Sequence, residues 1–65
     1  MEIYDPERHI QIPSFIRDAC RELRKAKRTI SAIKLLRGYC KHAHPAMYGK
    51  SPLGLRQAKE YVEIA

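Results

Sequence analysis

The sequence from Ser51 to Glu63, SPLGLRQAKEYVE, predicts a capped amphipathic helix over residues 52–63. Ser51 can accept a hydrogen bond from an unpaired first-turn N–H group, and Pro52 fits the first helical position because its missing donor costs nothing there. Gly54 lies inside this pattern, where glycine costs about 1 kcal/mol relative to alanine. We therefore expect Gly54 to let another backbone approach closely. The apolar residues that recur at helical spacing are Leu55, Ala58 and Val62.

A second amphipathic pattern predicts a helix over residues 29–42. Its apolar positions follow helical spacing, and Gly38 within it again suggests close packing. Three cations fall at spacings of three and four residues, which places them on one exposed ridge of the helix. The predicted buried positions are Ile30, Ile33, Leu36, Tyr39 or Cys40, and Ala43, and the ridge is Lys34, Arg37 and Lys41.

A third helix is predicted over residues 14–27, with Ser14 as its N-cap. Apolar residues recur along one face, and the opposite face is rich in arginine and lysine. The apolar stripe comprises Phe15, Ile16, Ala19, Cys20, Leu23 and Ala26. The sequence therefore predicts a mainly α fold: a small three-helix domain, residues 14–65, preceded by an N-terminal arm, residues 1–13.

The arm contains a short alternating pattern, His9-Ile10-Gln11-Ile12. No partner strand is visible elsewhere in the sequence, and a short strand does not form a stable sheet without partners. We therefore expect an extended arm that lays Ile10 and Ile12 on the helices.

The last two predicted helices resemble the helical hairpin of the C-terminal domain of ribosomal protein L7/L12, over residues 29–63. That family carries the signature Gly-Leu-Gly-Leu-Lys-Glu-Ala-Lys-Asp-Leu-Val-Glu, preceded by a helix of the type Lys-Ile-Ala-Val-Ile-Lys-Ala-Val-Arg. The two family helices are joined almost directly, whereas this chain inserts residues 41–50, which we expect to form a loop. Matching residues are Ile30, Ile33, Lys34, Arg37, Leu53, Gly54, Leu55, Ala58, Lys59, Val62 and Glu63, with Arg56 and Glu60 as conservative replacements.

Positive charge is concentrated in the middle of the chain. The 65 residues carry a net charge of +6, while Arg17 to Lys41 holds nine lysines or arginines against Asp18 and Glu22, a net of +7. Such a segment indicates an anionic partner, either an acidic protein surface or nucleic acid. A solvated helix face that keeps a small protein soluble is the alternative.

Two binding functions fit these features. In the L7/L12 family the matching hairpin recruits translational GTPases, so the resemblance implies a small protein-binding adaptor, for instance a phage or accessory protein acting on host machinery. The resemblance implies contacts through Ile33, Lys34, Arg37, Arg56 and Lys59. The alternative is a helix-turn-helix-like protein that contacts DNA or RNA phosphates. Its candidate residues are Arg21, Arg24, Lys25, Lys27 and Arg28.

The sequence does not indicate an enzyme, because it carries no phosphate-binding glycine loop, nucleophile elbow or paired-carboxylate pattern. We expect no cofactor and no membrane partner. A zinc site is the alternative for the cysteines and histidines, although they lack a Cys-x₂-Cys spacing. Two irregularly spaced cysteines indicate a reduced, cytoplasmic setting, and a homodimer would be one way to cover an open apolar stripe. The zinc candidates are Cys20, Cys40, His42 and His44.

Overall fold

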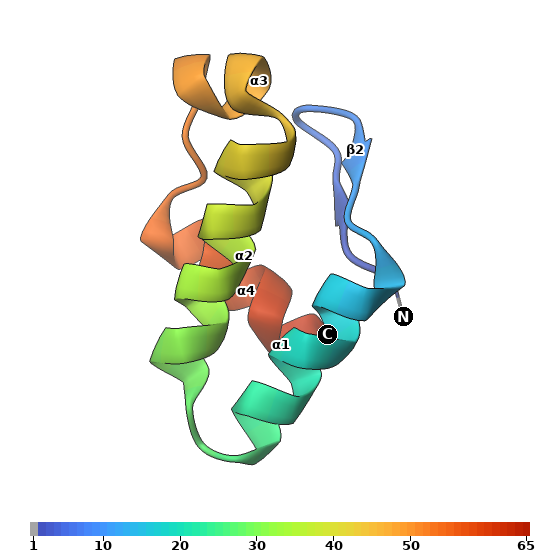
Figure 1. Ribbon diagram of the computed structural model, residues 1–65, viewed down its shortest axis with the longest axis vertical. Coiled ribbons are helices and arrows are strands. Elements are labelled where there is room, and N and C mark those ends of the chain that lie inside the picture. Colours follow the sequence, from blue (N-terminus) through green and yellow to red (C-terminus); the bar gives the residue numbers. More distant parts are fainter. Residues whose placement is uncertain (1) are drawn as a thin grey trace.

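The computed structural model describes residues 2–65 as a mainly helical domain organised around one central helix (Figure 1). This central helix, α2, packs against each of the other three. The elements are β1 (Tyr4–Asp5), β2 (Ile10–Gln11), α1 (Ser14–Lys25), α2 (Thr29–Ala43), α3 (Pro45–Lys50) and α4 (Leu55–Ile64).

The N-terminal segment is a β-hairpin and not the unpaired extended arm that the sequence predicted. β1 and β2 are antiparallel, with Tyr4 opposite Gln11 and Asp5 opposite Ile10. A two-residue strand is too short to show alternation, which is why its partner could not be seen in the sequence. The expected packing of Ile10 and Ile12 is confirmed, because both side chains are buried in the core together with Ile3.

The apolar stripes of the three predicted helices meet in one core. Interior positions are confirmed, whereas Ala26, which was expected in the stripe of α1, is its exposed C-cap. Three further apolar residues expected in the stripes, Phe15, Ile30 and Leu55, are 66%, 68% and 63% exposed. Each occupies the first or second position of its helix, outside the turns that face a neighbour. Phe15 lies edge-on to Tyr39, with ring centroids 6.3 Å apart. The core helix residues are Ile16, Cys20, Ala32, Ile33, Leu36, Cys40, Tyr48, Ala58 and Val62.

Several predicted helix boundaries are wrong. α4 begins at Leu55, and its N-cap is Gly54 rather than Ser51. Ser14 is already helical, and the N-cap of α1 is Pro13. The predicted loop over residues 41–50 contains α3, which has Pro45 in its first turn. Pro45 opens this helix, because the first turn of a helix does not need the N–H group that proline lacks.

The glycines do not serve the close packing that we expected. A Cβ atom added at Gly38 or Gly54 would have no neighbouring heavy atom within 4 Å. Ala43 was also predicted wrongly: it was expected to be buried, but it is exposed at the end of α2.

The connection between α1 and α2 is a Schellman turn with lysine in the left-handed position. Lys27 has φ 62°. The Arg28 amide donates to the Leu23 carbonyl at 2.8 Å, and the Lys27 amide donates to the Arg24 carbonyl at 3.0 Å. Glycine is the usual residue here, because a Cβ atom disfavours this conformation.

We expect Lys27→Gly to raise the free energy of unfolding by about 0.5–1 kcal/mol, because removal of the left-handed penalty outweighs the extra entropy of the unfolded chain. Urea unfolding followed by circular dichroism measures this change. Lys25→Gly, at the last residue of α1, is the matched control and should lower stability. Equal destabilisation by both glycines would contradict the assignment of strain to Lys27.

A buried ion pair attaches the hairpin to the segment between α3 and α4. Arg8 Nη1 donates to Asp5 Oδ2 at 2.7 Å, and both side chains are at least 95% buried. Arg8 also donates to the Ser51 carbonyl at 2.9 Å, the Ser51 hydroxyl at 3.0 Å and the Pro52 carbonyl at 3.3 Å. Tyr48 donates its hydroxyl to Asp5 Oδ2 at 2.9 Å. Within residues 2–65 no buried side-chain nitrogen or oxygen lacks a hydrogen-bond partner.

We expect Asp5→Ala to destabilise the domain by about 3–5 kcal/mol, because it strands the Arg8 charge in the interior. A domain of this size has about that much stability in total, so the variant should be largely unfolded at 25 °C. The measurement is thermal unfolding by circular dichroism. Glu22→Ala is the control, since the exposed Glu22–Lys25 pair, 4.0 Å apart, contributes little. A similar small effect from both substitutions would contradict the structural role of the buried pair.

Candidate functional site

The exposed face of α2 carries a row of three cations. The predicted ridge of Lys34, Arg37 and Lys41 lies on this face, and all three side chains are exposed. The helix contains no aspartate or glutamate. Among residues 2–65, no carboxylate lies within ion-pairing distance of these three cations. At 1.5 Å of rise per residue the ridge extends about 10 Å along the helix.

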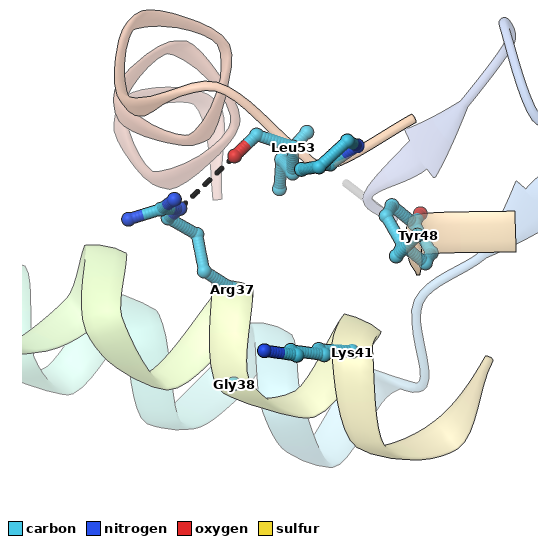
Figure 2. A pocket seen from close by; sticks show the side chains of 6 residues that line it. Arg37, Gly38, Lys41, Tyr48 and Leu53 are labelled. Carbon is cyan, nitrogen blue, oxygen red and sulfur yellow. Dashed lines mark hydrogen bonds between the residues drawn. The ribbon is translucent and has the colours of Figure 1, made fainter. Parts of the chain in front are cut away.

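A groove runs beside the ridge, between α2 and the segment that leads into α4 (Figure 2). Arg37 Nε donates to the Leu53 carbonyl at 2.9 Å, which ties the two walls together. The other N–H groups of the Arg37 guanidinium remain for an external acceptor. Figure 2 shows the Lys41 side chain lying along α2 towards Gly38. The groove is lined by Arg37, Gly38, Lys41, Tyr48, Pro52 and Leu53.

The size and chemistry of the groove limit what it can hold. Its volume is about 260 Å³, slightly less than the roughly 300–1,000 Å³ of sites for drug-sized ligands. Proline, leucine and tyrosine form one wall, and two cations stand on the other. Such a groove suits an apolar side chain whose neighbours are negatively charged.

The adaptor residues implied by the family resemblance lie on two helices that pack together, α2 and α4. Lys34, Arg37 and Arg56 are exposed. Lys59 is exposed and lies 3.9 Å from Glu63, one turn further along α4. Ile33 is only 8% exposed and belongs to the core. The exposed members of this set are therefore all cations.

The candidate nucleic-acid residues do not form one free surface. Arg21 Nε donates to the Ala65 carbonyl at 3.0 Å, and Arg24 donates to the carbonyls of Val62 and Glu63. Both arginines thus satisfy carbonyl groups at the C-terminal end of α4, where cations are favoured. Lys25 lies near Glu22, and the two remaining candidates, Lys27 and Arg28, are exposed at the corner between α1 and α2.

The four zinc candidates are not brought together. Cys20 and Cys40 are buried free thiols, whereas His42 is exposed and the His44 ring lies beside the Tyr48 ring. Cys20 donates to the Ala32 carbonyl at 3.7 Å. In the part of the chain that the structure describes, no group of three or more histidine, cysteine, aspartate or glutamate residues could hold a metal ion.

The chain matches no protein-family model, no curated protein and no solved structure. None of the helices within residues 2–65 has the length and apolar character needed to traverse a lipid bilayer.

Sequence reasoning found the ridge but missed the opposite wall of the groove. Tyr48 falls in the segment predicted to be a loop, residues 41–50, and the structure buries it. Met47, its neighbour, is exposed.

Three buried side chains, Tyr48, Cys20 and Cys40, have raised pKa values. Burial raises the pKa of the Tyr48 hydroxyl, and the Cys40 thiol and the Asp5 carboxylate raise it further. Burial also raises the pKa of both thiols, that of Cys20 and that of Cys40. All three groups are therefore held in their neutral forms in the folded protein.

These raised pKa values predict alkaline destabilisation. A group whose pKa is higher in the folded than in the unfolded chain stabilises the fold below its unfolded pKa, and this contribution is lost as pH rises. The ordinary values are 9.0 for cysteine and 10.0 for tyrosine, so stability should fall above about pH 9 and more steeply above about pH 10.

Urea unfolding at a series of pH values from 7 to 11 measures this slope. In Tyr48→Phe the fall above about pH 10 should be shallower than in the wild type, even though the variant is less stable at pH 7 because it loses the bond to Asp5. Tyr4→Phe, at an exposed tyrosine, is the matched control for removal of a phenol hydroxyl. Identical slopes for the wild type and Tyr48→Phe would contradict a role for the buried hydroxyl.

Proposed function

We propose that this protein is a small, non-enzymatic binding module that grips an acidic protein surface through the cationic face of α2. The observation that carries the proposal is a ridge of three exposed cations on a helix with no carboxylate, beside a partly apolar groove. Because no ion pair among residues 2–65 neutralises the ridge, its charges are available to a partner.

An acidic protein fits this face better than nucleic acid does. Nucleic-acid phosphates are bound by cations and polar donors, and they offer nothing to a wall of proline, leucine and tyrosine. Carboxylate side chains are bound by arginine through paired hydrogen bonds, and apolar side chains of a protein can occupy the wall. The arginines Arg21 and Arg24, which would serve phosphate binding, already bond to carbonyls of α4.

The resemblance of residues 29–63 to the L7/L12 hairpin supports the same function, because that hairpin binds proteins through corresponding cations. An accessory role on host machinery, such as that of a phage protein, is the setting we propose for such a module. The free buried thiols of Cys20 and Cys40 support placing it in the reducing cytoplasm.

The test compares two charge reversals of equal size. Lys34→Glu with Lys41→Glu changes the ridge, and both lysines are exposed without an internal ion pair among the described residues. Lys27→Glu with Arg28→Glu changes the corner between α1 and α2. The probes are a fluorescent peptide of alternating glutamate and leucine and a short DNA duplex, with binding measured by fluorescence anisotropy.

We expect the ridge variant to lose about tenfold or more in affinity for the peptide, while the corner variant loses only a few-fold through its change in net charge. Circular dichroism should show that both variants are folded. If the DNA duplex binds more tightly than the peptide and the corner variant loses most of that binding, the protein binds nucleic acid instead. If neither reversal weakens peptide binding, the proposed face is wrong.

A further inference from the structure

The groove beside the ridge points to a specific feature of the partner. Resting on the proposed function, we propose that the groove receives one apolar side chain of the partner, flanked on both sides by carboxylates. The partner is thus an acidic peptide segment with a single leucine-like anchor, and Gly38 forms the opening for that anchor.

Gly38 is the first observation behind this assignment. It lies in the interior of α2, where glycine destabilises a helix relative to alanine. The fold gives no reason for this residue, because its φ is not positive and a Cβ atom would meet nothing within 4 Å. The missing side chain does have one consequence, which is that the groove stays open at this point.

The opposite wall is the second observation. Tyr48 and Leu53 are almost fully buried, so the core fixes their positions, and Pro52 is the exposed residue of this wall. Pro52 is held through its carbonyl by Arg8, and Leu53 is held through its carbonyl by Arg37. The wall is therefore rigid and apolar before any partner arrives, which reduces the entropy cost of binding.

Charge complementarity decides what the anchor's neighbours must be. Arg37 and Lys41 are both lining residues of the groove, and the lining includes no acidic residue. The guanidinium of Arg37 is oriented by its bond to Leu53, and its terminal N–H groups can form paired bonds with a carboxylate. An apolar anchor with acidic neighbours matches both walls, whereas an apolar anchor with basic neighbours is repelled.

The test uses two nine-residue peptides that differ at one position. Both carry glutamate at eight positions, and the central residue is leucine in one and glycine in the other. Binding to the wild-type protein is followed by two-dimensional ¹H–¹⁵N NMR, in which the Gly38 amide reports directly on the groove. The variant Gly38→Leu fills the opening, and Ala43→Leu is the control for an added leucine at another exposed position of α2.

We expect the leucine peptide to bind the wild type about fivefold to tenfold more tightly than the glycine peptide, as a partly buried apolar side chain would provide. The signals of Gly38 and Leu53 should shift with the leucine peptide. Gly38→Leu should remove this preference and retain the weaker binding of the glycine peptide, while Ala43→Leu should behave as the wild type does.

The two proposals fail differently in this experiment. Equal binding of both peptides by the wild type, through signals of the ridge alone, would overturn the anchor and leave the acidic-surface function standing. An undiminished leucine preference in Gly38→Leu would also overturn it. No binding of either peptide at low salt would overturn the proposed function itself.

Discussion

The ion pair between Asp5 and Arg8 is the constraint on which the rest of this small domain depends. Two charges are taken out of water, and their cost is offset only because every polar atom around them is bonded. Besides its bond to Asp5 in the hairpin, Arg8 donates hydrogen bonds to the carbonyls of Ser51 and Pro52, 43 and 44 residues away. A hairpin of two-residue strands is marginal alone, and these bonds fix it against the segment that precedes α4.

The bonds of Arg8 also explain which parts of the fold could be predicted from the sequence. The interior turns of α1, α2 and α4 were predictable, because their apolar residues recur every three or four positions and need no distant partner. The start of α4 was not. Ser51 is a good capping residue by local chemistry, but its hydroxyl and carbonyl are used by Arg8, so the helix begins later, at Leu55. A tertiary bond overrode a local preference.

In the candidate site, too, the features set by helical spacing could be predicted and those set by tertiary contacts could not. The ridge of Lys34, Arg37 and Lys41 follows from helical spacing alone. The groove does not, because its second wall exists only after Tyr48 has bonded to Asp5 and Pro52 has bonded to Arg8. The cations of α1 show the opposite error, since spacing predicted a free face whereas Arg21 and Arg24 bond to α4 carbonyls. Helical spacing predicts the face on which a charged side chain lies. Only tertiary packing decides whether that side chain already has a hydrogen-bond partner within the domain.

The ridge and Gly38, which lines the groove, each destabilise α2, and both lie on the same side of the helix. Like charges three or four residues apart on a helix repel by about 0.2–0.5 kcal/mol per pair, and Gly38 weakens the same helix by about 0.5–1 kcal/mol relative to alanine. Within residues 2–65 neither cost is offset, since the ridge forms no ion pair and a Cβ atom at Gly38 would have no close contact. A domain of 65 residues has little stability to spare. Two such departures from local stability fall together here, and the acidic partner that we propose would supply both the missing charge and the missing side chain.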